Sequence, residues 1–161
     1  QHRGHLERDD LAELTAAVPG ADILGVSFDL GSFATVRRGA KELAEKLDRL
    51  DVLVCNAGIF ANERVEVAPG LEASLAVNHV GHVLLTELVK PLLLAAAPAR
   101  VIVVSSVAHT RGRIHLDDLS MTSAYPSLRN AGTSSKLFTI FHCPQFSIIF
   151  IMLNNVSVFP N

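Results

Sequence analysis

The chain has 161 residues, which is enough for one domain with a hydrophobic core, and 49% of them are apolar. Its formal net charge is −2 and its basic residues form no patch, which argues against a nucleic-acid-binding protein. Cys55 and Cys143 make neither a disulfide framework nor a CxxC pair, so we expect reduced thiols in an intracellular protein. Residues 1–10 are polar and predict no signal peptide, and Gln1 in place of Met indicates that upstream sequence is missing.

In chain order, the apolar pattern alternates between helical and strand-like segments. Helical periodicity predicts helices over 4–18, 33–49 and 71–96, the last kinked at Pro91, and another from about residue 127. Apolar runs predict strands over 22–30, 51–55 and 100–106, with loops over 59–69 and 107–126. Because the strands are almost continuously apolar and alternate with helices, the sequence predicts an α/β fold around a parallel sheet.

Each predicted strand ends in a short polar or small-residue segment. The three ends read Asp29-Leu30, Asn56-Ala57-Gly58 and Ser105-Ser106. Ligands of an open parallel sheet bind outside the carboxyl ends of its strands. There, a carboxylate can accept a hydrogen bond from an amino group, and small residues let a flat ligand approach the backbone. Together the three ends predict a nucleotide-shaped cleft with a reactive end, where Ser106 can donate to a carbonyl.

These residues resemble the short-chain dehydrogenase/reductase family, most closely its branch of retinol dehydrogenases and WW-domain-containing oxidoreductases. The matching segments follow the family's order and approximate spacing: DL at 29–30, LVCNAG at 53–58, VNHVGHVLLT at 77–86, ARVIVVSSVAH at 99–109 and SKL at 135–137. The resemblance covers roughly residues 3–141. It implies a partial Rossmann-type, doubly wound parallel sheet that lacks its first two strands.

The resemblance implies that the first two strand ends bind a nicotinamide cofactor. Asp29, followed by Leu30, corresponds to the acidic residue that meets the adenine ring. Asn56, Ala57 and Gly58 correspond to the segment that supports the nicotinamide end and stabilises the central sheet. Arg3 is similar to a residue that binds the NADP phosphate, so the expected cofactor is NADP or NAD, with NADP favoured.

Three further residues match catalytic positions of the family. Ser106 would hold the substrate carbonyl, and Asn78 would kink its helix and support a proton-relay water. Lys136 would bind the nicotinamide ribose and lower the pKa of a neighbouring tyrosine. Each also has an ordinary interpretation: Ser106 as the cap of a strand, Asn78 as a polar helix residue and Lys136 as a solvated surface charge.

The sequence departs from the family at the tyrosine. The family places it four residues before the lysine, where this chain has Gly132, and the only tyrosine, Tyr125, lies eleven residues before Lys136. A tyrosine has an ordinary pKa near 10 and works as a base only where a cation favours its phenolate. The family's glycine-rich phosphate loop is also absent from the sequence. We therefore expect the chain alone to be an impaired enzyme.

The predicted function by resemblance is an NAD(P)-dependent oxidoreductase that interconverts an alcohol and a carbonyl by hydride transfer. The alternative, which stays open, is an inactive fragment or pseudoenzyme that acts at most as a binding module. The expected partner is a small, lipophilic alcohol or carbonyl compound and no nucleic acid. Homo-oligomerisation through the 71–96 helix and membrane association of the full-length protein also stay open. His79, His82 and His109 offer too few ligands to predict a metal site.

The domain boundaries follow from where the resemblance ends. Residues 1–142 are expected to form a partial dinucleotide-binding domain and residues 143–161 a divergent apolar tail. Within that tail, 148–153 is too short to span a bilayer and is expected to be a buried strand or an exposed segment.

The missing strands raise a packing problem between 22–30 and 51–55. In the order 3-2-1-4-5-6 these are the third and fourth strands, so the absent first and second would leave a gap between them. Backbone groups cannot stay unpaired in a dry gap. Either 22–30 pairs directly with 51–55, or 148–153 fills part of the gap. We expect direct pairing, because the 33–49 helix makes the right-handed crossover between them.

Overall fold

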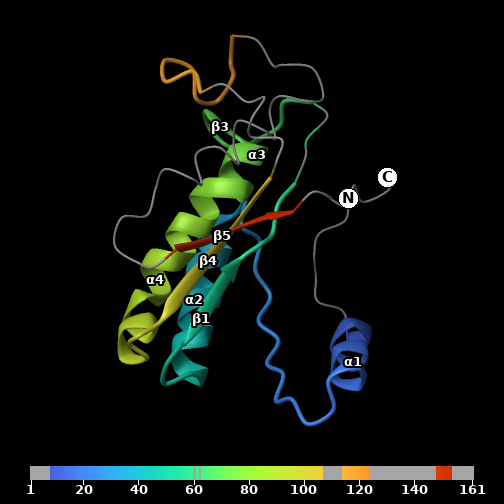
Figure 1. Cartoon of the computed structure of the whole chain (residues 1–161). Coiled ribbons are helices and arrows are strands. Elements are labelled where there is room, and N and C mark those ends of the chain that lie inside the picture. The colour runs from blue at the N-terminus through green and yellow to red at the C-terminus, as the bar shows by residue number, and fades with distance from the viewer. Residues whose placement is uncertain (1–7, 60, 62, 107–113, 124–147, 154–161) are drawn as a thin grey trace.

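The computed structural model describes residues 8–59, 61, 63–106, 114–123 and 148–153. Within them the predicted α/β architecture is confirmed, with a parallel sheet of order β1–β4–β5 (Figure 1). Its strands are β1 (Val52–Cys55), β4 (Arg100–Ser106) and β5 (Ile148–Leu153). The predictions for 51–55 and 100–106 are thus confirmed to within a residue, and 148–153 is a strand.

Helices α2 (Phe33–Lys46) and α4 (Gly81–Ala95) cover one face of this sheet. Val36, Leu93 and Val101, one from each of α2, α4 and β4, are at most 1% exposed and mark the centre of the core. The apolar stripe predicted for the 33–49 helix packs as expected. Its members Val36 and Ala40 are buried in this core.

The predicted 71–96 helix is three consecutive segments: α3 (Ala73–Leu75), the π-helical η1 (Ala76–Val80) and α4. The fully buried Glu72 side chain begins it by accepting from the backbone N–H groups of Ser74 and Leu75, at 2.9 and 2.8 Å. Of the two positions expected to distort this helix, Pro91 lies inside α4, and the departure from α geometry lies in η1, which contains Asn78.

A hairpin occupies part of the predicted loop 59–69. Its strands are β2 (Glu66–Ala68) and β3 (Leu71–Glu72), which pair in antiparallel orientation around a Pro69-Gly70 turn with Gly70 at φ 73°. Arg64 donates from Nε to the Ser120 carbonyl at 2.9 Å, which ties residues 114–123 to the hairpin. Hydrogen bonds from Arg64 and from the Gly70 backbone lower the pKa of the exposed Glu66 carboxyl.

The predicted strand 22–30 is wrong, and so is its predicted pairing with 51–55. Residues 21–29 run as an extended stretch outside the sheet (Figure 1), and β4 is the only partner of β1 within the described part of the chain. The physical reason is that an apolar sequence becomes a strand only beside a backbone with free hydrogen-bonding groups. The second expectation fails too, because β5 lies on the far side of β4 from β1.

Helix α1 (Arg8–Ala17) confirms the helix predicted over 4–18 but stands apart from the rest of the molecule in Figure 1. Its Leu14 is 48% exposed. Among the residues that the structure describes, no sheet face covers Leu14 of α1, in contrast to the buried residues of α2 and α4.

Candidate functional site

The ends of β1 and β4 lie at the same edge of the sheet. Their parallel register pairs Cys55 with Val103, so Asn56-Ala57-Gly58 follows the ladder on the side where β4 continues to Ser105 and Ser106. Ala57 and Gly58 are exposed. Two of the three predicted strand ends are thus neighbours, with a small-residue backbone open to solvent.

Asn78 fixes the tip of β1 to the helix behind it. Its side chain accepts from the Ile59 backbone N–H at 2.7 Å and donates to the Ile59 carbonyl at 2.9 Å. The side chain is 1% exposed and belongs to η1. π-helical turns inside α-helices recur at functional sites. The position predicted to distort its helix is therefore where the helix is distorted, and its amide orients the Asn56–Ile59 turn.

The Asp29 end is a turn held by two side chains. Asp29 Oδ1 accepts from the Gly31 backbone N–H at 2.8 Å, and the Ser32 N–H donates to the Asp29 carbonyl at 3.0 Å. Thr35 Oγ1 accepts from the Asp29 N–H at 3.0 Å and lies 2.9 Å from the Asp29 carbonyl oxygen. The exposed carboxylate is thus held in place while its other oxygen keeps acceptor capacity.

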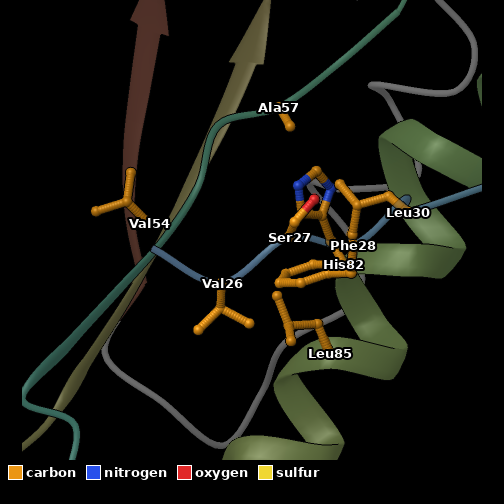
Figure 2. A pocket seen from close by; sticks show the side chains of 8 residues that line it. All are labelled: Val26, Ser27, Phe28, Leu30, Val54, Ala57, His82 and Leu85. Carbon is orange, nitrogen blue, oxygen red and sulfur yellow. The ribbon is translucent and has the colours of Figure 1, made fainter. Parts of the chain in front are cut away.

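Leu30 lies against the start of α4. A Cβ added at Gly81 would collide with the Leu30 carbonyl oxygen, so only glycine permits this approach of helix and backbone. Segment 26–30, the end of β1 and α4 border a cavity of about 250 Å3. Figure 2 shows the side chains that line it. Its lining residues are Val26, Ser27, Phe28, Leu30, Val54, Ala57, His82 and Leu85. Leu30 and Ala57, from two predicted strand ends, therefore border one space.

A buried polar column supports this region from α4. His82 is 6% exposed, and its Nδ1 lies 3.3 Å from the Asn78 carbonyl oxygen. Thr86 Oγ1 donates to the His82 carbonyl at 2.8 Å and lies 3.9 Å from the Cys55 thiol. These contacts join the end of β1 to the helix that carries Asn78. Within the described ranges, no group of three or more His, Cys, Asp or Glu residues could hold a metal ion.

The structure places the remaining predicted site residues only in part. Ser106 is the last residue of β4, so its backbone reaches the edge of the sheet that β1 also reaches. Lys136, Gly132 and Tyr125 lie outside the described residues, as do His109 and the helix predicted from about 127. The site thus brings together Asn78, Asn56-Ala57-Gly58 and the Asp29-Leu30 end.

Three residues that position the site were not predicted from the sequence. Thr35 locks the Asp29 turn, Gly81 admits Leu30, and Glu72 caps the helix that presents Asn78. Gly81 had a usable signal, because an isolated glycine in an apolar helical run indicates close packing. Glu72 stands at an N-cap, where Asp or Ser is more usual, and Thr35 lies inside the first turn of α2 after the N-cap Ser32, so local sequence alone gives a weak signal for either.

No helix in the part of the chain that the structure describes is long and apolar enough to cross a bilayer.

Comparison with known proteins gives consistent results. The family model described as short chain dehydrogenase matches residues 5–120. Human retinol dehydrogenase 14 is 38% identical over 76% of this chain and 38% of its own length. Human dehydrogenase/reductase SDR family member 13 is 41% identical over 71% of the chain and 29% of its own length. The chain thus spans well under half the length of these relatives.

Solved structures agree with the sequence matches. An uncharacterised protein from Mycobacterium Paratuberculosis superposes with a TM-score of 0.65 at 34% identity, over 80% of this chain and 45% of the other. The Pseudomonas aeruginosa RhlG/NADP active-site complex gives a TM-score of 0.56 at 31% identity, over 80% of this chain and 47% of the other. These matches agree with the site geometry, in which Asn78 holds the backbone just past β1. The chain therefore belongs to the short-chain dehydrogenase/reductase family, in its retinol dehydrogenase-like branch.

Proposed function

We propose that the protein is part of an NAD(P)-dependent oxidoreductase that interconverts a lipophilic alcohol and its carbonyl by hydride transfer. The observation that carries the proposal is the tip of β1, where small residues are exposed to solvent and the buried Asn78 amide grips the backbone just beyond them. The Asp29 turn and the end of β4 supply the other two strand ends of such a cleft.

The residues present fit a nicotinamide dinucleotide at this edge. The Asp29 carboxylate is exposed and held by the Gly31 N–H, which leaves it able to accept from an adenine amino group. Ala57 and Gly58 put no large side chain between their backbone and a flat ring. Lys136 would bind the ribose. The cofactor supplies hydride transfer when it is bound, and the protein supplies its orientation. NADP is favoured over NAD on Arg3, a residue outside the described part of the chain.

The chain's own residues divide the remaining work. Ser106 would hold the carbonyl oxygen through its hydroxyl, at the end of β4. Asn78 acts as a positioning residue, because its side chain is spent on Ile59 and keeps the β1 tip in register with the helix. Gly132 supplies no hydroxyl at the position four residues before Lys136, so proton exchange at the alcohol oxygen is the weak step of this chain.

The proposal is tested by carbonyl reduction in the longest natural form of the protein that contains these residues. NADPH- and NADH-dependent reduction of retinal would be measured for the natural protein, for Ser106→Ala and for Gly132→Tyr. We expect Ser106→Ala to lower kcat by about 100-fold with unchanged NADPH affinity. We expect Gly132→Tyr to raise kcat, by a factor within the range of about 10²–10⁴ that a general acid/base contributes. Equal rates for the natural protein and Ser106→Ala would refute the assigned role.

Gly132 also favours a second candidate, a protein that binds a nucleotide or a partner without turnover. A natural form with saturable NADPH binding and no retinal reduction, in which Gly132→Tyr restores reduction, would be such a pseudoenzyme. Homo-oligomerisation through the 71–96 helix stays a prediction under either function.

A further inference from the structure

The β2–β3 hairpin touches two parts of the candidate site. A Cβ added at Gly31 would lie 3.4 Å from Cγ1 of Val67, so β2 packs against the turn in which Gly31 lies. The Ala73 N–H donates to the Val65 carbonyl at 2.8 Å, which joins the hairpin to the helical run that carries Asn78. The hairpin therefore connects the turn at one side of the candidate site with the helix behind β1.

Arg64 joins this hairpin to residues 114–123, which follow β4 in the chain. Its Nε donates to the Ser120 carbonyl at 2.9 Å, and its Nη2 lies 2.6 Å from Glu66 Oε1. The Ser120 hydroxyl donates in turn to the Gly70 carbonyl. Because the Arg64 side chain is only 23% exposed, water screens these contacts less than it would at an open surface. One guanidinium thus holds the segment to the hairpin and is itself oriented by a carboxylate.

Segment 114–123 keeps its shape through bonds of its own. The Asp118 carboxylate accepts from the Thr122 N–H at 2.7 Å and from the Ser123 N–H at 2.8 Å. The Met121 N–H donates to the Asp118 carbonyl at 3.1 Å. These bonds do not involve the hairpin. The contact with the hairpin therefore decides where the segment lies, and not how it is folded.

The same segment lies in the chain between two residues assigned to the reaction. Ser106 would hold the carbonyl oxygen of the substrate, and Lys136 would bind the nicotinamide ribose. An anchor between two such residues divides one long connection into two shorter ones, and a shorter free chain has fewer conformations. The anchored position of 114–123 therefore bears on how these two residues are placed relative to each other.

We propose that Arg64 is a positioning residue of the reductase: by anchoring residues 114–123 to the hairpin, it keeps Ser106 and Lys136 in a common geometry around the substrate carbonyl. This inference rests on the proposed function and adds a residue to it. Arginine suits the role because its planar fork donates to a carbonyl and a carboxylate at once, which the compact ammonium of lysine does not reproduce.

Three variants separate the anchor from a general loss of charge. Arg64→Met keeps an apolar stem and removes every donor. Glu66→Gln removes the ion pair and keeps the Nε bond to Ser120. Arg49→Met is the matched control, because the Arg49–Asp51 ion pair lies at the start of β1, at the opposite end of the strand from the candidate site.

Retinal reduction with NADPH is measured in the longest natural form of the protein and, because Gly132 weakens the proton step, also in its Gly132→Tyr variant. We expect Arg64→Met to lower kcat about tenfold, the effect of one lost hydrogen bond from a charged group. Glu66→Gln should lower kcat about twofold, and Arg49→Met should leave it unchanged. The Kd of NADPH should stay constant throughout, because the strand ends that meet the cofactor have side-chain contacts of their own.

Amide signals of the whole chain separate loss of the anchor from unfolding. The Met121 amide shares its peptide group with the Ser120 carbonyl, so its chemical shift should move in Arg64→Met. The Thr122 and Ser123 amides should keep their signals in this variant, because their bonds lie within the segment.

An unchanged kcat in Arg64→Met, an equal loss in Arg49→Met or an unmoved Met121 signal would overturn the proposal. A rise in the Kd of NADPH that matches the fall in kcat would also overturn it, since Arg64 would then act on cofactor binding. Absence of retinal reduction in both the natural form and Gly132→Tyr would refute the proposed function and this role with it. Reduction that Arg64→Met leaves unchanged refutes this role alone.

Discussion

Segments 22–30 and 52–55 are both apolar and both end in small or polar residues, yet only the second is a strand. β1 pairs residue by residue with β4, whereas the backbone of 22–28 has no hydrogen-bond partner among the residues that the structure describes. The comparison teaches that the neighbour decides whether an apolar run becomes a strand. The chain is nevertheless fixed at or just past both ends, because Thr35 bonds to the Asp29 backbone and Asn78 to the Ile59 backbone beyond β1. Site geometry here depends on side chains more than on the sheet.

The largest expected effect comes from separating 22–30 from the helix that holds its end. Gly81→Ala places a methyl group against the Leu30 carbonyl, and neither backbone can yield, so we expect a loss of about 3 kcal/mol in the free energy of unfolding. Gly39→Ala is the matched control. Its methyl meets the side chain of Phe28 at Cδ1 and Cγ and not a backbone carbonyl, so the Phe28 side chain must move, while alanine favours the helix by about 1 kcal/mol; we expect a smaller loss than for Gly81→Ala. Urea denaturation of both variants measures the difference, and equal losses would contradict the rigid Leu30–Gly81 contact.

Removing the side-chain contact that holds the backbone just past β1 should cause the next largest loss in the free energy of unfolding. Asn78→Ala leaves the Ile59 N–H and carbonyl without their partner, and we expect a loss of about 2 kcal/mol. The Ile59 amide should exchange faster, while the ladder amide of Leu53 changes only with global stability. Asn78→Asp keeps the acceptor for the Ile59 N–H and should protect that amide better than alanine does. Unchanged exchange of the Ile59 amide in both variants would contradict the role of the Asn78 side chain in holding this backbone.

A smaller effect is expected at the turn that ends 22–30. Thr35→Val keeps the shape of the side chain and removes the hydroxyl that accepts from the Asp29 N–H, with an expected loss of about 1 kcal/mol. Thr35→Ser keeps the hydroxyl and serves as the control. Amide exchange at Asp29 reports the local change. If Thr35→Val and Thr35→Ser give the same amide exchange at Asp29, the Thr35 hydroxyl does not hold the turn. The turn would then depend on Asp29 Oδ1 and on the backbone bond from Ser32 to Asp29.

The smallest effect concerns a third segment without a ladder, residues 114–123. Hydrogen bonds from the backbone of Ser123, then from the Thr122 backbone and hydroxyl, hold the pKa of the Asp118 carboxyl well below its ordinary value of 3.8. Because the pKa of Asp118 is lower in the folded chain than in the unfolded chain, its ionised carboxylate stabilises the loop at every pH above the ordinary pKa of 3.8. This contribution is lost only as the pH falls through the pKa of the folded state. We therefore expect the Thr122 and Ser123 amide signals to keep their positions down to about pH 3. Asp118→Asn should shift them at neutral pH, whereas Asp117→Asn, which removes the same charge, should not.

The sequence predicted the parts of the fold whose signals are local. The 33–49 helix follows from its apolar stripe, and the 100–106 strand from its continuous apolar run. The segment 56–58 was singled out because an amide, a methyl group and a bare backbone follow an apolar strand in that order, and its place directly after β1 is confirmed, while its role in cofactor binding stays a prediction. The family resemblance then identified Asn78, whose buried amide matches its expected position at a helix distortion.

The features that escaped prediction depend on contacts distant in sequence or on very short elements. The prediction of a strand over 22–30 was wrong because none of the described strands lies beside this segment to pair with its backbone. Such a neighbour depends on contacts distant in sequence, which the local apolar pattern does not reveal. The β2–β3 hairpin has strands of three and two residues, too short for a period-two pattern to stand out. Gly81 meets Leu30 only after α4 has packed, and Thr35 bonds to Asp29 only after the intervening turn has formed.

The central claim is that the ends of 22–30 and of β1 form a cofactor-binding edge already held in shape by this chain. Titration of the isotope-labelled chain with NADPH, followed by amide chemical shifts, tests it most directly. Because a glycine-rich phosphate loop is absent from the sequence, we predict weak binding, in the range of about 1 mM. The shifts should be concentrated at residues 29–31 and 56–59. Shifts that avoid both segments, or saturable binding in the micromolar range, would contradict the account.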